Sequence, residues 1–335
     1  MRTPAAVVAG VDFGDAGFAA TVRDGVAKIE QLMDTELRSA DAIMTDSLTH
    51  LFKAGGKRFR PLFTVLSAQV GPKPDAAEVT IAGAVIELVH LATLYHDDVM
   101  DEAEVRRGAP TANVRWSNNV AILAGDYLFA TASRLVSRLG PEAVRLIAET
   151  FAQLVTGQMR ETRGVAEGAD SIEHYLKVVY EKTACLISAA GEFGAMFSGA
   201  DDDQIARLSR LGGLVGTAFQ ISDDIIDIDS DSHESGKLPG TDVREGVHTL
   251  PMVYALAEPG PEGARLRELL AGPVEDDDAV TEALTLLRAS PGMAKAKDFL
   301  AQYAAKARHE LALLPDVAGR HALEALVDYT ISRHG

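Results

Sequence analysis

Apolar residues recur at every third and fourth position through most of the chain, whereas stretches of alternating apolar and polar residues are hard to find. The pattern is clear in "AVIELVHLATLYHD", "AVRLIAETFAQLV" and "IARLSRLGGLVGTAFQI". It is interrupted by short segments such as "KAGGKRFRP", "VGPKPDA" and "RRGAPT", and by the longer "DSDSHESGKLPGTDVREGVHTLP". The sequence therefore predicts an all-α protein whose helices are joined mostly by short loops.

The chain shows neither an internal repeat nor a low-complexity linker, so we expect a single domain over residues 1–335. Residues 1–14 are predicted to be a flexible N-terminal segment. Pro61 suits the first turn of a helix, and the runs Asp201–Asp203 and Asp276–Asp278 suit helix starts, where acidic groups favour the helix dipole.

Composition limits the classes of partner that the protein is expected to bind. Asp and Glu number 49 against 32 for Lys and Arg, and the net charge of −17 argues against a nucleic-acid partner. A small anionic substrate is still compatible, because a local basic cluster or a bound cation can invert the field at one site.

The single cysteine, Cys185, permits no internal disulfide and is interpreted as a small core residue in a reducing compartment. The first residues are not expected to form a signal peptide, and no uninterrupted apolar run approaches the roughly 20 residues that span a bilayer. A cytoplasmic location is expected, with at most peripheral membrane contact.

The segment "LYHDDVMDEAEVRRGAP" places Asp97, Asp98 and Asp101 close together and then sets Arg106 beside Arg107. A helix turns about 100° per residue, so it brings Asp97 and Asp101 onto one face. His90 lies on the same stripe. Two carboxylates and an imidazole therefore share a helix face.

"FQISDDIIDID" repeats this spacing with Asp223, Asp224 and Asp227. Carboxylates about 4 Å apart repel by roughly 4 kcal/mol at an effective dielectric constant of 20, so something cationic must offset the repulsion. Carboxylate ligands without nearby Cys suit Mg²⁺, which completes its coordination with water and substrate phosphate. A phosphate or diphosphate substrate follows from this assignment.

Basic residues in "GGKRFRP", together with Arg106 and Arg107, are candidates for the diphosphate oxygens that the metal does not hold. Gly212 and Gly216 precede the second aspartate cluster on its own helix face. They indicate either close packing of a neighbouring helix or an elongated apolar ligand along that face, and the sequence leaves both open.

Six motifs occur together in a fixed order: "GGKRFRP", "HDDVMDEAEVRRGAPT", "LAGDYLFA", "EKTA", "FQISDDIID" and "GKLPGTDVREGVHTLP". In these motifs the sequence closely resembles the all-trans polyprenyl diphosphate synthases, over about residues 20 to 255. The resemblance implies the isoprenoid synthase fold, an antiparallel helical bundle around a deep central cavity. It further implies a homodimer, with the two aspartate motifs facing each other across the mouth.

The resemblance also implies roles for individual residues. The catalytic group would comprise Asp97, Asp101, Asp223 and Lys182. The first three would bind Mg²⁺, roughly three ions in each site, with support from Asp98, Asp224 and Asp227. Isopentenyl diphosphate would contact Lys57, Arg60, His90 and Arg107. The allylic diphosphate would contact Arg106, Lys182, Thr183, Gln220 and Lys237.

One position departs from the family pattern. Many relatives carry Lys where "DVREGVHTLP" has Val247, which puts one expected phosphate contact in doubt. Arg244 or His248 is a candidate substitute.

The expected reaction is condensation of isopentenyl diphosphate with an allylic diphosphate such as farnesyl or geranylgeranyl diphosphate. Mg²⁺ would assist departure of the allylic diphosphate towards a carbocation. Ala92 and Val89 would lie about 7.5 and 12 Å back from Asp97 along the helix, beside the growing tail. Because Ala92 is small, a long product of about 35 to 45 carbons is predicted, as in bacterial synthases of quinone tails. Ala92 would alternatively serve close helix packing alone.

Several alternatives are open at this point. The product could be shorter, such as geranylgeranyl or hexaprenyl diphosphate, or the chain could be a non-catalytic subunit of a heteromeric synthase. A terpene cyclase would share the metal chemistry but would not need a second diphosphate site. A di-iron carboxylate bundle is suggested only by Glu87-x-x-His90 and Glu245-x-x-His248.

Overall fold

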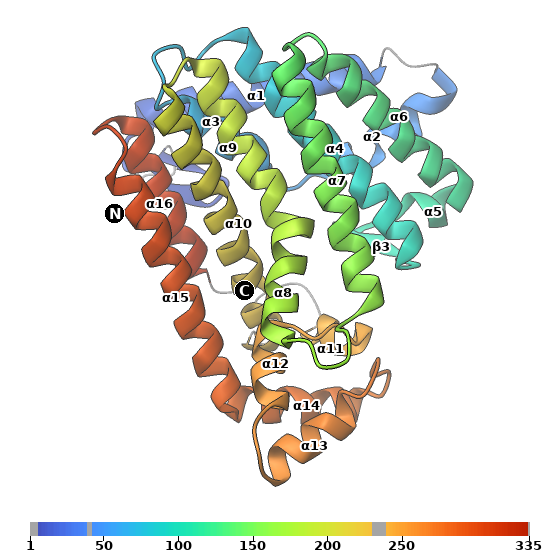
Figure 1. Cartoon of the computed structure of the whole chain (residues 1–335). Coiled ribbons are helices and arrows are strands. Elements are labelled where there is room, and N and C mark those ends of the chain that lie inside the picture. The colour runs from blue at the N-terminus through green and yellow to red at the C-terminus, as the bar shows by residue number, and fades with distance from the viewer. Residues whose placement is uncertain (1–5, 39–41, 230–238, 334–335) are drawn as a thin grey trace. The chain divides into compact units, whose positions relative to one another are not determined.

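The computed structural model describes residues 6–38, 42–229 and 239–333 (Figure 1). Helices dominate these residues, which confirms the all-α prediction. The first half of the chain contains α1 (Ala16–Arg38), α2 (Ala42–Lys53), α3 (Phe59–Ala68), α4 (Ala77–Met100), α5 (Ala112–Arg115), α6 (Asn118–Val136) and α7 (Pro141–Arg163). The second half contains α8 (Ser171–Val179), the π-helix η2 (Tyr180–Ala184), α9 (Cys185–Ser198), α10 (Asp202–Asp229), α11 (Thr241–Glu245), α12 (Leu250–Leu256), α13 (Pro261–Leu269), α14 (Asp277–Ala289), α15 (Pro291–Ala312) and α16 (Ala318–Ser332).

The chain divides into two compact units. The first comprises residues 1–153, 185–212 and 310–325, and the second comprises residues 154–184, 213–309 and 326–335. The division falls inside long helices, so α10 contributes its first turns to one unit and its remaining turns to the other. The single-domain interpretation stays a prediction.

Helix α4 is the central element of the first unit, where it packs against α1, α3, α6 and α9 (Figure 1). It is apolar on all sides, as a helix surrounded by others must be. Tyr95 is the largest fully buried side chain, and its hydroxyl donates to the carbonyl of Ser47 and accepts from the amide of Leu51 at 3.3 Å. Its polar end is thereby satisfied inside the core.

By its length and composition, helix α4 could also cross a membrane. It does not, however, contain an uninterrupted apolar run of that length. In the fold, 61% of its most apolar window is buried within the protein. We interpret it as a core helix that positions His90, Asp97 and Asp98.

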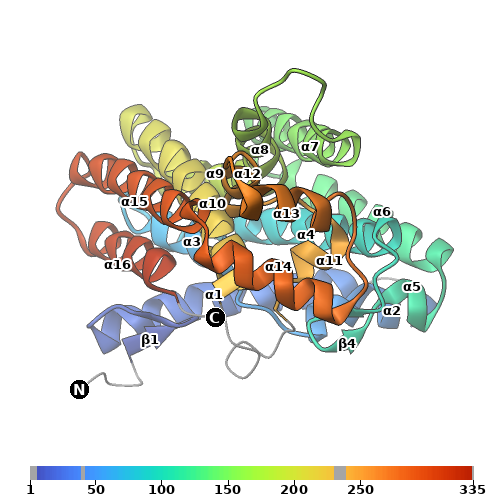
Figure 2. The same cartoon turned by 90° about the horizontal axis from the view of Figure 1, so that it is seen from below.

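The second unit has its own core, formed by α8, the later turns of α10, and α11 to α15. Ile221 and Ile228 of α10 are fully buried there together with Leu250 and Leu287. The short helices α12, α13 and α14 pack consecutively (Figure 2). The apolar face of α10 therefore holds the second aspartate motif in place.

Two small antiparallel hairpins accompany the helices: β1 (Val7–Val8) with β2 (Val11–Asp12), and β3 (Val105–Arg106) with β4 (Ala109–Pro110). Each strand has two residues, too short to produce an alternating pattern in the sequence. The first hairpin lies in the segment that was expected to be flexible, and Ala6 and Val11 there are buried.

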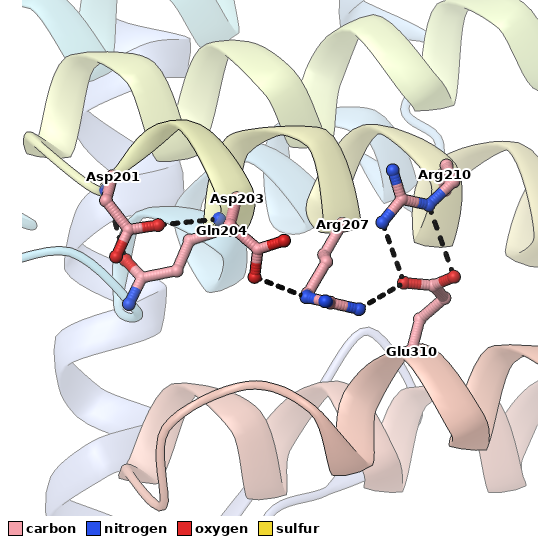
Figure 3. A network of polar contacts seen from close by, with 6 residues as sticks. All are labelled: Asp201, Asp203, Gln204, Arg207, Arg210 and Glu310. Atoms are coloured by element: carbon pink, nitrogen blue, oxygen red, sulfur yellow. Dashed lines mark hydrogen bonds and ion pairs between the residues drawn. The ribbon is translucent and has the colours of Figure 1, made fainter.

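The acidic helix starts are confirmed. Asp201 precedes α10 and accepts from the amide of Gln204 at 2.8 Å, while the Gln204 side chain accepts from the amide of Asp201 at 3.2 Å. This reciprocal pair is a capping box (Figure 3). Asp276 caps α14 in a similar way by accepting from the amide of Ala279 at 2.8 Å.

Arginines link the start of α10 to the end of α15 within the first unit (Figure 3). Arg207 bonds Asp203 at 2.6 Å and Glu310 at 3.3 Å, and Arg210 bonds both oxygens of Glu310 at 3.2 Å. Hydrogen bonds from Arg210 are the main reason why the pKa of Glu310 lies below its usual value. The network is partly exposed, so its contribution to the stability of the fold is small.

Gly212 answers one question that the sequence left open. A methyl group at this position would lie 2.4 Å from the carbonyl oxygen of Ile187, on α9. The glycine therefore permits close approach of two helices. It is not explained by a ligand along the helix face.

Candidate active site

The first aspartate motif is built by the last turn of α4. Asp97 and Asp98 lie in this turn, and Asp101 caps it with an amide hydrogen bond to the carbonyl of Asp97 at 2.8 Å. Asp101 is exposed, Asp97 is half-buried and Asp98 is fully buried. Two of the three carboxylates therefore reach solvent, as the proposed metal ligands require.

Asp98 has a different role, because it binds Arg106. Burial raises the pKa of Asp98, and the hydrogen bond from Arg106 opposes that shift. The sequence assigned Arg106 to the allylic diphosphate. In the structure its guanidinium holds a buried carboxylate at the base of the motif.

The β3–β4 hairpin determines where the two arginines lie. Arg107 and Gly108 form its two-residue loop with φ angles of 54° and 74°, the combination required by a type I′ turn. Arg107 extends back to the carbonyl oxygens of Leu51, at 3.2 Å, and Gly55. A methyl group on Gly56 would lie 2.9 Å from its guanidinium carbon, so this glycine makes room for the arginine.

Arg58 holds the loop that carries Lys57. It has a left-handed backbone with φ of 49°, and its guanidinium donates to the carbonyl oxygens of Phe52 at 2.8 Å and Gly55 at 3.2 Å. It also binds Glu30 of α1 at 2.7 Å and Glu87 of α4 at 3.3 Å. Arg58 thus joins three segments of the first unit.

Glu87 is a buried carboxylate in this group of arginines. Its residue is 2% exposed, and burial raises its pKa while Arg58, Arg60 and Arg107 lower it. From the sequence, Glu87 was considered only as a metal ligand in the di-iron alternative. Because its charge is directed to arginines, that alternative loses one of its proposed ligands.

Arg60 and His90 complete the group, while Lys57 is exposed. Burial lowers the pKa of Arg60, whose Nε has no hydrogen-bond partner among the described residues. The pKa of His90 is lowered well below its usual value, first by burial and then by Arg60 and Arg107. His90 is therefore a neutral imidazole that can donate one ring N–H to an anion.

The second aspartate motif lies on α10 within the second unit. Asp224 is buried and accepts from the hydroxyl of Tyr175 at 2.5 Å and from the side-chain amide of Gln220 at 2.9 Å. Burial raises its pKa to about 7 despite these two hydrogen bonds. Asp223 is 46% exposed along its side chain and binds Arg333.

Asp227 holds the start of α11. Its two carboxylate oxygens accept from the amides of Thr241 and Asp242, each at 3.1 Å, at the start of α11. The pKa of Asp242 is raised to about 8, chiefly by burial and then by Asp224 and Asp227. Asp223, Asp224, Asp227 and Glu245 thus place four further carboxylates near Asp242.

Lys182 and Thr183 lie in the π-helix η2. Such a turn is often found at functional sites. Thr183 donates to the side chain of Gln220 at 3.3 Å, and Lys182 pairs with Glu161 of α7. A methyl group on Gly157 would lie 2.7 Å from the amide nitrogen of Lys182, so the glycine lets α7 approach this turn.

The remaining predicted positions give mixed results. Lys237 lies outside the described residues. Val247 is partly exposed, while its suggested substitutes have partners: Arg244 binds Asp277 at 2.7 Å and His248 hydrogen-bonds with the carbonyl of Leu270 at 2.9 Å. Whether either residue replaces the expected phosphate contact stays a prediction.

Ala92 and Val89 lie on the buried side of α4, 0% and 2% exposed respectively. Their burial is compatible both with a wall beside the growing tail and with helix packing. Their role in product length stays a prediction.

The donor atoms fit Mg²⁺. Asp97 and Asp101 in the first unit, and Asp223 in the second, each offer hard oxygen ligands, although no group of three or more metal-binding side chains occurs among residues 6–38, 42–229 and 239–333. Mg²⁺ is commonly bound through one or two carboxylates, with water and substrate phosphate in its remaining positions. Each aspartate motif by itself therefore suits a metal that arrives with a phosphorylated substrate.

Sequence reasoning missed five contributors: Glu87, Glu161, Tyr175, Asp242 and Arg333. Glu87 was noted only in the Glu87-x-x-His90 pattern, which does not reveal that it binds arginines. "GTDVREG" contains Asp242 but does not reveal that the carboxylate is buried. The other three become visible only through contacts made across the fold.

Comparison with known proteins decides the family. The sequence model described as polyprenyl synthetase matches residues 41–287. The chain belongs to this family.

Members of the polyprenyl synthetase family match almost the whole chain. Nonaprenyl diphosphate synthase of Mycobacterium tuberculosis is 80% identical over 335 residues, covering 100% of both chains. Dimethylallyltranstransferase of the same organism is 57% identical, covering 97% of this chain and 99% of its own. These names confirm an enzyme of the prenyltransferase class.

A solved structure of the polyprenyl synthetase family confirms the fold. Geranylgeranyl pyrophosphate synthase from Corynebacterium glutamicum, complexed with calcium and isoprenyl diphosphate, has a TM-score of 0.88 and 50% sequence identity. The match covers 97% of this chain and 100% of that one. The resemblance inferred from the six motifs is therefore confirmed.

Proposed function

We propose that this protein condenses isopentenyl diphosphate head-to-tail with an allylic diphosphate, such as farnesyl or geranylgeranyl diphosphate. The observation that carries the proposal is the basic group of Arg58, Arg60 and Arg107, together with neutral His90, in the same unit as the first aspartate motif. A diphosphate site and a divalent-cation site are thus provided by α4 and the loops attached to it.

The chain's own residues have separable tasks in this reaction. Lys57, Arg60 and Arg107 hold the isopentenyl diphosphate, and neutral His90 donates a hydrogen bond without adding charge. Tyr175 and Gln220 hold the buried Asp224 by hydrogen bonds. These contacts keep the second aspartate motif in place, and the first carboxylate of that motif, Asp223, is the more exposed one. The apolar side of α4 excludes water from the reacting carbons.

Asp97 and Asp101 of the first unit and Asp223 of the second would be the Mg²⁺ ligands, and the family resemblance implies roughly three ions in all. When bound, Mg²⁺ supplies positive charge that stabilises the departing allylic diphosphate. Lys182 and Thr183 would contact that diphosphate, with Lys237 as a further candidate. Arg106, whose Nε binds Asp98, is a further candidate for contact with that diphosphate.

The proposed product is an all-trans polyprenyl diphosphate of about 35 to 45 carbons, nearer the upper end, because the nonaprenyl relative is 80% identical. A quinone side chain is its proposed destination, in the cytoplasm with at most peripheral membrane contact. The geranylgeranyl synthase at 50% identity supports a shorter product as the second candidate.

We further propose a homodimer in which α6 contributes to the interface. Ile122 and Leu123 are 41% and 60% exposed on this helix, so it presents apolar surface to solvent. A monomeric mass in light scattering would contradict the proposal. Leu123→Asp should weaken a dimer while the isolated chain stays folded.

Product analysis tests the function directly. The purified protein is incubated alone with isopentenyl diphosphate, farnesyl diphosphate and Mg²⁺, and the products are identified by mass spectrometry. A nonaprenyl product supports the proposal, and geranylgeranyl diphosphate as the end product supports the second candidate. A cyclised hydrocarbon without isopentenyl incorporation would identify a cyclase instead. Folded protein that is active only after a second chain is added would indicate a heteromeric synthase.

A further inference from the structure

Arg333 follows α16 and is held firmly within the second unit. Leu326 and Val327, in the last turns of α16, are 0% and 3% exposed, and the guanidinium carbon of Arg333 lies 4.0 Å from the centre of the Phe219 ring. Its Nη2 also donates to the carbonyl of Phe219 at 3.4 Å. The arginine side chain is 5% exposed, so its position is fixed by packing.

This fixed guanidinium binds Oδ1 of Asp223, the first carboxylate of the second aspartate motif. Asp224, Asp227 and Asp242 belong to the same acidic group, in which Asp227 accepts from the amide of Asp242 at 3.1 Å. Carboxylates at this spacing need a nearby positive charge. In the first aspartate motif Arg106 provides one for Asp98, and in the second Arg333 provides one for Asp223.

The contact does not enclose the carboxylate. Asp223 keeps 46% of its side-chain surface exposed, whereas Arg333 is almost completely covered. The guanidinium therefore approaches from the protein side, and a metal ion can approach from the solvent side. Arginine and metal would share one carboxylate and repel each other.

We propose that Arg333 is a resident cation of the second aspartate motif, which neutralises Asp223 and thereby weakens its hold on a divalent metal ion. This inference rests on the proposed role of Asp223 as a metal ligand. Its consequence is a higher metal requirement, because the ion binds to a carboxylate whose charge is already compensated. The same contact stabilises the acidic group before an ion binds.

Arg333→Gln tests the charge while retaining an amide that can donate to Asp223, and Arg333→Lys retains the charge. Arg308→Gln is the matched control, because Arg308 pairs with Asp328 at 2.6 Å between α15 and α16. Binding of Mn²⁺ alone is measured by electron paramagnetic resonance, and thermal unfolding is measured in the presence of a chelator.

A unit charge and a divalent ion about 6 Å apart in water repel by about 1.4 kcal/mol, a factor of about ten in affinity. Arg333→Gln should therefore bind Mn²⁺ about tenfold more tightly and unfold at a lower temperature in chelator. Arg333→Lys and Arg308→Gln should stay within about twofold of the unaltered protein in Mn²⁺ affinity, well short of that factor.

Unchanged or weaker Mn²⁺ binding by folded Arg333→Gln would overturn the inference. Asp223→Asn separates this failure from failure of the proposed function. If Asp223→Asn weakens Mn²⁺ binding while Arg333→Gln has no effect, the metal site stands and the resident-cation role falls. If Asp223→Asn binds Mn²⁺ normally, the metal assignment itself is wrong.

Discussion

Arg58→Ala should destabilise the protein and weaken isopentenyl diphosphate binding together. The substitution removes ion pairs with Glu30 and Glu87 and two hydrogen bonds to loop carbonyls. Removing one partner of a buried ion pair typically costs about 3 to 5 kcal/mol. For 335 residues the unfolding entropy is about 0.7 kcal/mol/K, so the melting temperature should fall by about 4 to 7 °C.

Glu87 gives this prediction a pH dependence. Burial already raises its pKa, and loss of Arg58 removes one of the charges that oppose the shift. A carboxylate whose folded-state pKa is raised loses stability as the pH rises from its usual value to the folded-state value. The deficit of Arg58→Ala should therefore be larger at neutral pH than at a pH of about 4, the usual pKa of a glutamate, and Glu87→Gln added to it should recover part of the loss.

Glu30→Gln is the control, since it removes the other partner of the same guanidinium. The Glu30 side chain is 38% exposed, so its loss should cost no more than about 1 kcal/mol. Steady-state kinetics should show a larger rise in KM for isopentenyl diphosphate than for the allylic substrate in Arg58→Ala. If the melting temperature of Arg58→Ala stays within about 1 °C of that of the unaltered protein, the change is smaller than the costs above allow, and the reasoning is refuted. Equal effects of Arg58→Ala and Glu30→Gln would refute it as well.

Three further outcomes are expected. Asp97→Ala or Asp223→Ala should lower kcat at least about a thousandfold in a radiolabel incorporation assay, about 4 kcal/mol of lost transition-state stabilisation, and near-normal turnover would contradict the metal assignment. Lys57→Ala should lose one charge-assisted contact of about 1.5 to 3 kcal/mol and raise KM mainly for isopentenyl diphosphate; equal changes in both KM values would show that the two diphosphate sites are misassigned. Ala92→Phe, with a ring about 7.5 Å back from Asp97, should shorten the main product to about 15 or 20 carbons by mass spectrometry, and an unchanged product from active enzyme would place the tail elsewhere.

The sequence by itself determined the helical class, the helix starts and the two aspartate motifs. These features depend on residues separated by one or two turns, and helix periodicity fixes which of them share a face. Asp201 and Asp276 illustrate this, because their capping partners lie three residues away. The family followed from short motifs for the same reason, since each motif is local and their order is printed in the chain.

Only the tertiary structure decided how the charges are paired. Arg58 and Glu87 are 29 positions apart, and Arg333 and Asp223 are 110 apart. No local pattern predicts such pairs, because helix packing selects them. For the same reason the sequence predicted a substrate contact for Arg106, whereas the structure shows its ion pair with Asp98. The reason for a glycine at Gly212 also became visible only through the close approach of the carbonyl oxygen of Ile187. Burial then determined which carboxylates serve as supports and which reach solvent, since a charged group is costly to bury unless a partner offsets it.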